Sequence, residues 1–380
     1  MSGHLRVAFW SKQLCEQGTE IALYDYADYA ETLLGWRSFV FYEQRSHNNF
    51  RGTISKFVNR FGDRVIALPG DEEHQIVDAL DTWLERNHIA HLYMIKCHVD
   101  DGYLPQTSVR TLVHSVFDAT RPHGDVYCRI SKCVPGDAPV LPHIVRPRIV
   151  NGRNLRSALG IPEGATVFGR HGGMNTFDID FVREVIVDVA STRPDIFFVL
   201  LNTPPVCESD EPPNVKHLDA TAEEERKCEF IRTCDAMLHA RSCGETFGLA
   251  IAEFSAHNRP VITSSVHNND GCARMHLDTL ADQGLYYSDR ASLTRILLEF
   301  DRETSRGKDW NCYRAFEPEH VMTLFKRLFL HTPAVSATER LPPYFAQRDR
   351  RMRSLIRMNR DQAFAKELGV DESIDCSDLF

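Results

Sequence analysis

Short apolar runs alternate with amphipathic stretches along the first third of the chain. Runs rich in β-branched and aromatic residues predict strands at 5–10, 38–42, 91–95 and 110–114. Apolar positions at helical spacing predict helices at 19–34 and 73–86. This order of elements is typical of an α/β protein with a parallel sheet covered by helices.

A second series of the same kind follows a proline-rich stretch. Pro135, Pro139, Pro142 and Pro147 interrupt regular structure and indicate a crossing between two domains. Beyond it, strands are predicted at 166–169, 196–201, 236–239 and 260–263, and helices at 180–191 and 248–257. We therefore predict two Rossmann-like, doubly wound domains, residues 1–148 and 149–335, followed by a helical segment over 336–380.

Composition narrows the class of protein. The 380 residues exceed one ordinary core, and no apolar run approaches the ~20 residues that span a bilayer. The first residues lack a secretory cleavage site, so we expect a soluble, cytoplasmic protein. The 11 cysteines include no Cys-x2-Cys pair, which favours free thiols over a metal site. The net charge of −9 argues against a nucleic-acid partner.

The segment 244–254, Gly-Glu-Thr-Phe-Gly-Leu-Ala-Ile-Ala-Glu-Phe, carries the strongest chemical signal. A glycine-bearing turn leads from a strand into a helix, whose first N–H groups favour an anion such as a diphosphate. Glu245 and Glu253 would lie about 80° apart around the helix and about 12 Å apart along it. They would contact different parts of one extended ligand, as the hydroxyls at the two ends of a sugar nucleotide require.

This segment resembles the retaining GT-B glycosyltransferases of family 4, whose signature is Glu, seven residues and Glu in this setting. The resemblance implies that Glu245 is catalytic and faces the donor sugar, and that Glu253 binds the ribose. Thr246, Phe247 and Gly248 would donate backbone N–H groups to the diphosphate. The alternative is that each glutamate only stabilises a helix N-terminus.

The resemblance also implies an architecture and a reaction. Two domains would face each other across a cleft, with a C-terminal helix crossing back to the first. A glycosyl unit would pass from a nucleoside diphosphate sugar to a hydroxyl of a glycan, glycolipid or other acceptor, with retention and without a metal or other cofactor. The alternatives are a sugar-nucleotide epimerase, a phosphorylase or a non-catalytic nucleotide- or sugar-binding module of the same fold.

The stretch 167–174 is a strand that ends in a basic, glycine-rich turn. In the resembled family an arginine here contacts the diphosphate, so Arg170 is a candidate for binding and catalysis, with His171 and Gly172 beside it. A lysine usually follows about five residues later, but this chain has Asn175 and Thr176. Either His171 or the amides of Gly172 and Gly173 would then replace that cation.

Two candidates come from the first domain. Gly18 lies in the turn after the first strand, where the resembled enzymes have glycines that face the donor phosphates; a simple tight turn is the alternative. His114 ends a predicted strand, and the resemblance places a histidine there beside the reacting sugar. It is our catalytic candidate from the acceptor side, although a packed histidine is the more common case.

Three weaker features remain. Arg241, in the sequence 239–241, would pair with a phosphate or hold a glutamate, and the polar stretch 264–271 suits sugar hydroxyls. Asp178-Ile-Asp180 has the spelling of a metal motif but leads into a helix, so we predict no metal there. Arginines at 348, 350, 351, 353, 357 and 360 alternate with apolar residues, which indicates a solvated helix or a peripheral contact with an anionic membrane.

Overall fold

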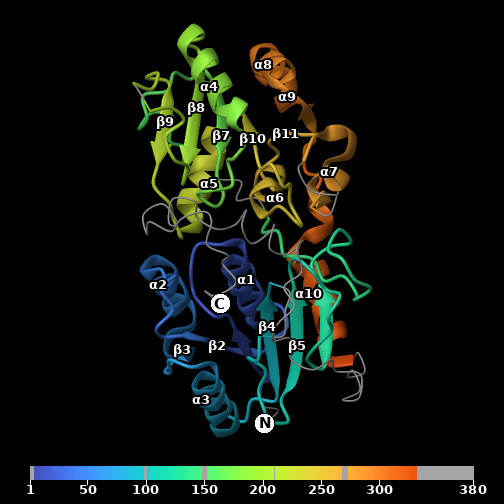
Figure 1. The fold of residues 1–380 in the computed structure, drawn as a ribbon. Helices are drawn as coiled ribbons and strands as arrows, with labels where there is room; N and C mark the ends of the chain where they lie inside the picture. The colour runs from blue at the N-terminus through green and yellow to red at the C-terminus, as the bar shows by residue number, and fades with distance from the viewer. Residues whose placement is uncertain (1–3, 98–100, 148–151, 209, 268–272, 332–380) are drawn as a thin grey trace, which may run out of the picture.

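The chain forms two lobes, each built on a six-stranded parallel sheet (Figure 1). The computed structural model describes residues 4–97, 101–147, 152–208, 210–267 and 273–331. The two lobes are stacked end to end, with α1, α2 and α10 at the edge of the first lobe that meets α5 and α6 of the second. The predicted α/β architecture with two doubly wound sheets is confirmed.

The first lobe has the strand order β3-β2-β1-β4-β5-β6. Its strands are β1 (Arg6–Trp10), β2 (Arg37–Glu43), β3 (Val65–Leu68), β4 (His91–Lys96), β5 (Arg110–Ser115) and β6 (Val126–Arg129). Its helices are α1 (Gly18–Thr32), α2 (Arg51–Phe61) and α3 (Glu73–Arg86), with a 3-10 turn η1 (Gly62–Arg64) after α2. The sequence predictions missed α2, β3 and β6.

The second lobe repeats this arrangement with the order β12-β11-β10-β7-β8-β9. Its strands are β7 (Thr166–Arg170), β8 (Ile196–Leu201), β9 (Val215–Leu218), β10 (Ala236–Leu238), β11 (Val261–Ser264) and β12 (Leu285–Tyr287). The helices and 3-10 turns that follow in the chain are α4 (Asp180–Thr192), α5 (Glu224–Thr233), α6 (Leu249–Ala256), α7 (Met275–Leu280), η2 (Ala281–Gln283), α8 (Arg290–Glu299), α9 (Arg302–Arg306), η3 (Arg314–Phe316) and α10 (Pro318–His331).

Both sheets reverse their winding direction at an inner pair of strands. Strand β1 pairs with β4 in the first lobe, and β7 pairs with β10 in the second. In sheets of this type, ligands bind beyond the carboxyl ends of the strands at such a switch point. The turns after β1, β7 and β10 are therefore the places where the fold presents side chains to a ligand.

The last described helix belongs to the core of the first lobe. Phe325 of α10 is fully buried, and its ring lies 5.0 Å from that of Tyr26 and 5.7 Å from that of Tyr93. Arg110 Nε donates to the carbonyl of Phe329 at 2.7 Å. The chain thus crosses back to the first lobe at α10, within the range predicted for the second domain. The predicted crossover over 336–380 lies outside the described residues.

The proline-rich segment forms the other connection between the two lobes, and hydrogen bonds hold it in place. The hydroxyl of Tyr26 donates to the carbonyl of Pro142 at 2.6 Å, and Val145 N–H donates to the carbonyl of Phe316 at 2.8 Å. Ile144 and Val145 are buried in one apolar cluster that also holds Tyr93 of the first lobe and Phe247 of the second. The two lobes therefore share a continuous apolar contact.

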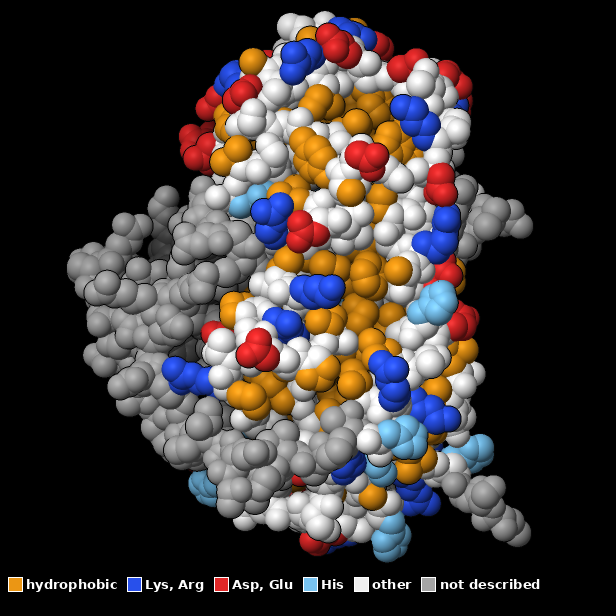
Figure 2. Space-filling view, turned by 90° about the vertical axis from the view of Figure 1, so that its right-hand side faces the viewer, with side chains coloured by type: hydrophobic (Ala, Val, Ile, Leu, Met, Phe, Trp, Pro, Cys, Tyr) orange, Lys and Arg blue, Asp and Glu red, His pale blue; other side chains and the backbone are white. Residues whose placement is uncertain are grey.

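One side of the molecule is shown in Figure 2. Apolar side chains gather along its middle, and acidic and basic side chains are intermingled around the end formed by the second lobe.

Within the described ranges, no helix combines the length and the apolar character needed to cross a membrane.

Candidate functional site

Arg170 is the last residue of β7, and its guanidinium forms hydrogen bonds with other residues of the protein. It is almost fully buried and donates from Nη1 to the carbonyl of Asn202 (2.6 Å) and to Thr203 Oγ1 (2.7 Å). Its Nη2 donates to Thr176 Oγ1 (2.9 Å) and to the carbonyl of Gly173. Burial lowers the pKa of Arg170 to about 9. Arg170 therefore fixes the turn 171–176 against the end of β8.

Thr176 is one of the two residues found where the resemblance implies a lysine. Its hydroxyl accepts from Arg170 and donates to the carbonyl of Gly173 at 2.8 Å. Gly172 adopts a φ of 151°, and its carbonyl accepts from Asn202 Nδ2 at 3.0 Å. The turn after β7 is thus shaped by hydrogen bonds among its own residues and the loop that follows β8.

His171 connects this turn to α6. Its ring stacks on Phe254 with centroids 5.6 Å apart and an interplanar angle of 23°. Its Nε2 lies 3.1 Å from Glu253 Oε2. The predicted binding residues His171 and Glu253 are therefore direct neighbours, although 82 positions separate them in the sequence.

Glu253 is held from both sides. Lys227 of α5 forms an ion pair with Oε1, and His171 faces Oε2. Burial by itself would raise the pKa of Glu253, but the ammonium of Lys227 and the imidazole of His171 hold it well below its usual range. The carboxylate is ionised at neutral pH and only 15% of the side chain is exposed.

Glu245 lies in the turn between β10 and α6 and is also ionised. Arg241 Nη1 donates to its Oε2 at 2.8 Å, and His239 Nε2 lies 3.4 Å from its Oε1. Burial alone would raise the pKa of Glu245, but Arg241 and His239 lower it well below its usual range. The prediction that Arg241 either meets a phosphate or holds a glutamate is decided for the glutamate in this structure.

The backbone of this turn is fixed by two glycines and a neighbouring segment. Gly244 and Gly248 have φ values of 69° and 83°, which favour glycine, and Gly248 caps α6. The carbonyl of Glu245 accepts from Met275 N–H at 3.0 Å. These features fix the positions of the Glu245 side chain and of the first N–H groups of α6.

Thr246 and Phe247 have different surroundings. Thr246 is partly exposed, whereas Phe247 is buried, with its ring 5.2 Å from that of His143 and 5.2 Å from that of Phe316. Its carbonyl accepts from the Tyr313 hydroxyl at 3.1 Å. The Phe247 side chain therefore anchors the turn to the segments that join the lobes, and only its backbone is available to a ligand.

Gly18 brings the first lobe to this site. It is the first residue of α1, after β1, and a Cβ built on it would lie 3.4 Å from Leu249 Cδ1. Leu249 is the first residue of α6. The N-termini of α1 and α6 thus meet where the lobes join, and that Gly18 faces the donor phosphates stays a prediction.

His114 lies near the carboxyl end of a first-lobe strand, as predicted, but its ring is buried. It lies within β5, is fully buried, and its ring is held by the Tyr93 hydroxyl at Nδ1 (2.7 Å) and the carbonyl of Leu141 at Nε2 (2.6 Å). Burial holds its pKa well below the usual range. Both nitrogens serve the core of the first lobe, so the expectation that His114 faces a cleft is at odds with the structure.

A group of histidines near Glu245 was missed by the sequence predictions. The ring of His276 lies 5.3 Å from that of His239 and 5.1 Å from that of His267, and His276 is fully buried. Each comes from a different element, so only the fold brings them together. The residues that the structure describes contain no group of three or more His, Cys, Asp or Glu side chains with the geometry to hold a metal ion.

The remaining weak candidates have local partners. Asp178 accepts from the N–H and hydroxyl of Ser242 at 2.7 and 2.6 Å, so it supports the turn before Glu245. Ser264 is buried and donates to the carbonyl of Val266. Residues 268–272 of the polar stretch predicted to meet sugar hydroxyls lie outside the described residues.

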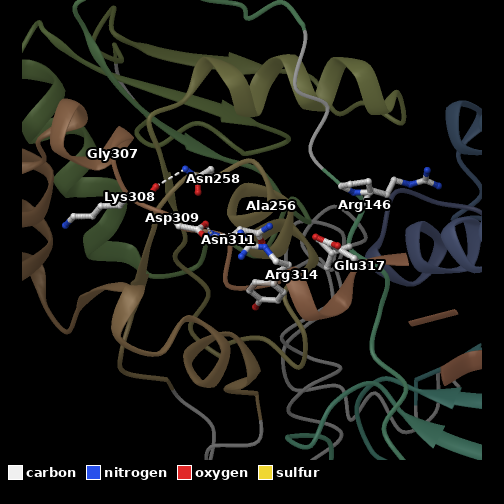
Figure 3. Close-up of a pocket in the computed structure, with 12 residues that line it drawn as sticks. Arg146, Ala256, Asn258, Gly307, Lys308, Asp309, Asn311, Arg314 and Glu317 are labelled. Atoms are coloured by element: carbon white, nitrogen blue, oxygen red, sulfur yellow. Dashed lines mark hydrogen bonds and ion pairs between the residues drawn. The ribbon is translucent and has the colours of Figure 1, made fainter. Parts of the chain in front are cut away.

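A cavity of about 550 Å³ lies elsewhere, at the C-terminal end of α6 (Figure 3). It is lined by the linker residue Arg146, by Asn258, and by residues of the 307–317 segment, including Arg314 and Glu317. None of the predicted site residues lines it. It therefore lies at the end of α6 opposite to the N-terminus, where Gly18 meets Leu249.

Comparison with solved structures identifies proteins that have a similar fold. No protein-family model and no curated protein sequence matches the chain. Similar solved structures include WaaG, a glycosyltransferase involved in lipopolysaccharide biosynthesis, with 13% identity over 86% of this chain and all of WaaG at a TM-score of 0.60. HepE from Anabaena, solved in complex with UDP and glucose, has 12% identity over 87% of this chain and all of HepE at 0.62.

A third similar structure is the sucrose-phosphate synthase of Thermosynechococcus elongatus, with 14% identity over 87% of this chain and all of that structure at a TM-score of 0.60. The likeness extends over both lobes and lies in the backbone rather than in sequence identity. The chain therefore has the GT-B fold of these enzymes.

Proposed function

We propose that this protein is a glycosyltransferase that transfers a glycosyl unit from a nucleoside diphosphate sugar to an acceptor hydroxyl. The observation that carries the proposal is the placement of two ionised glutamates, Glu245 and Glu253, at and beyond the N-terminus of α6, at the switch point of the second sheet. HepE, which shares the fold, was solved with UDP and glucose.

In this proposal Glu245 accepts hydrogen bonds from the donor sugar and Glu253 from the ribose. The first N–H groups of α6 and the turn after β7 contact the diphosphate between them. Gly18 leaves room for the phosphates on the first-lobe side. Arg170 contributes by shaping the turn and by its charge, because its guanidinium already donates to four protein oxygens.

The chemical step requires stabilisation of the negative charge that develops on the leaving diphosphate. The helix N-terminus and the charge of Arg170 supply it in our proposal, without a metal ion. Retention of the anomeric configuration and an acceptor bound to the first lobe complete the assignment. His114 is no longer included among the catalytic groups, because its ring lies inside the first lobe.

A thermal-shift panel of UDP, GDP, dTDP and ADP sugars tests donor binding, followed by a transfer assay with NMR detection of the product anomer. Glu253→Gln should weaken nucleotide affinity at least 10-fold, whereas Glu245→Gln should mainly lower kcat. Glu225→Gln, an exposed position on α5, serves as the matched control.

The other outcomes are equally informative. If no nucleotide sugar stabilises the protein, the donor site is refuted. Turnover of the donor without an acceptor would identify an epimerase, and sugar release by inorganic phosphate a phosphorylase. Tight nucleotide binding with no transfer across a broad acceptor panel would identify a non-catalytic module. Loss of activity in EDTA that added Mg²⁺ restores would overturn metal independence.

A further inference from the structure

Lys227, on α5, is a buried cation beside the proposed nucleotide site. Its side chain is 11% exposed, and its ammonium contacts Glu253 Oε1 and lies 3.2 Å from Glu224 Oε2. Nothing in the signature of residues 245–253 or in the turn after β7 points to this lysine. The packing of α5 beside α6 brings it to Glu253.

The charges around Lys227 indicate what kind of ligand group this corner accepts. One ammonium faces two carboxylates, and a single imidazole, that of His171, closes the other side of Glu253. The ionised groups Lys227, Glu224 and Glu253 together carry a net negative charge, to which Asp25 adds and which Lys56 and Arg146 offset. At hydrogen-bond distance the Glu253 oxygens repel a phosphate, whereas they accept from hydroxyl groups that donate hydrogen bonds.

Lys227 therefore does not replace the lysine that is missing from the turn after β7. A cation that is paired with two carboxylates has little charge left for a phosphate. Its effect falls on Glu253 instead: it occupies one carboxylate oxygen and keeps the group ionised. The remaining lone pairs of Glu253 are then presented in a fixed direction.

We propose that Lys227 is a positioning residue of the donor site, which orients Glu253 so that its carboxylate accepts the ribose hydroxyls of the nucleotide. This inference rests on the proposed function, because it assumes that Glu253 meets a ribose. It assigns a role to α5, which the sequence predictions did not include among the elements of the site.

Removing Lys227 has a consequence that a loss of packing alone would not have. Burial would then raise the pKa of Glu253. Of the two side chains that contact its carboxylate, only His171 would remain to oppose that rise. The groups that face this cluster are Glu224 and Cys228 of α5, His257 directly after α6, and, from the first lobe and the linker, Lys56, Asp25 and Arg146. A protonated Glu253 loses acceptor capacity, so nucleotide binding should become dependent on pH.

The experiment measures the binding of UDP, dUDP and inorganic pyrophosphate to the full chain by calorimetry between pH 5.5 and 8.5, with GDP and ADP and their 2′-deoxy forms run in parallel. The wild type should bind one ribonucleotide at least 10-fold more tightly than its 2′-deoxy form, with little change across this pH range. Lys227→Met should lose that preference and bind the ribonucleotide progressively more weakly as the pH falls. Lys227→Arg should restore both properties.

Pyrophosphate separates the two roles open to a lysine. Its affinity should be the same in Lys227→Met and the wild type; an equal loss of pyrophosphate and ribonucleotide affinity would make Lys227 a phosphate ligand and overturn the proposal. If Lys227→Met does not fold, the double variant Lys227→Met/Glu253→Gln removes both charges, and retention of the wild-type preference for ribose in it would also overturn the proposal. A wild type that binds no nucleotide at all would instead refute the proposed function.

Discussion

Gly18 of the first lobe lies against Leu249 of the second, so closely that a Cβ on Gly18 would stand 3.4 Å from Leu249 Cδ1. That distance is an ordinary contact for a methyl group, whereas a longer side chain has to find room beside Leu249. The two residues begin α1 and α6, the helices whose N-termini border the proposed phosphate site. The contact sets how closely the lobes approach there.

Gly18→Leu should force the two helices apart and lower kcat/KM for glycosyl transfer at least 10-fold. Gly18→Ala is the matched control, since its methyl group fits and alanine favours a helix. The thermal midpoint of Gly18→Ala should equal that of the wild type, because Gly18 is exposed and the added methyl group makes an ordinary contact. Equal activity of the two variants would show that the lobes do not need this approach.

Arg170→Met should destabilise the fold as well as weaken nucleotide binding. The substitution leaves the carbonyls of Asn202 and Gly173 without their donor, at a cost of about 2–4 kcal/mol in the free energy of unfolding. Denaturant unfolding measures this cost. Arg193→Met, which removes an exposed ion pair with Asp195, should leave stability unchanged. A phosphate-binding arginine without a structural role would instead show wild-type stability.

Arg241→Met should move the acid limb of the pH–rate profile to higher pH. Arg241 lowers the pKa of Glu245 against the effect of burial, so its loss lets burial raise that pKa and protonate the carboxylate under mildly acidic conditions. Activity near pH 5.5 should fall more than activity near pH 8. A uniform loss at every pH would mean that Arg241 acts only through packing.

Buried neutral histidines should make the protein sensitive to acid. Burial lowers the pKa of His143 to about 3 and that of His267 to about 4, and holds those of His114 and His276 well below 6.5. Below pH 6.5 the unfolded chain binds protons at these histidines and the native state does not. The free energy of unfolding therefore decreases as the pH is lowered.

Each such histidine should contribute about 1.4 kcal/mol per pH unit between pH 6.5 and 4.5. Burial raises the pKa values of Glu20 and Asp25, which opposes this trend. Unfolding in urea at several pH values measures the slope. His143→Gln should reduce it, whereas His320→Gln, at an exposed position, should not.

Phe325→Ala should destabilise the protein by about 3–5 kcal/mol, as expected for a large cavity in a packed core. The ring contacts Tyr26, Trp36 and Tyr93 of the first lobe. Lys326→Ala, at the next and exposed position of α10, is the control and should unfold with the wild type. Similar stabilities of the two variants would contradict the assignment of α10 to the first-lobe core.

Much of the fold could be predicted because long elements carry a clear period. Helix α3 and strand β8 have the predicted bounds, Glu73–Arg86 and Ile196–Leu201. Helix α2 was missed although its apolar positions 54, 57, 58 and 61 follow helical spacing. Strands β3, β6 and β9 contain four residues each, too few for a period of two to stand out.

The site could be predicted only in part. Glu245 and Glu253 share one segment, so their spacing along the sequence was enough to single them out as candidates. The contact of Lys227 with Glu253 depends on how α5 packs beside α6, which no local pattern encodes. The position of His114 at the end of a predicted strand did not indicate which neighbours its ring meets, and Tyr93 and Leu141 take both of its nitrogens.

The return of α10 to the first lobe also bears on how the chain folds during its synthesis. Multidomain chains generally fold domain by domain as they leave the ribosome, starting from the N-terminus. Here the apolar surface around Tyr26, Trp36 and Tyr93 stays uncovered until residues 318–331 have emerged. The strands of the second lobe, which end at Tyr287, are complete before that point. The lobe made first is thus the lobe finished last, and its exposed core is the surface that a nascent chain of this protein must protect.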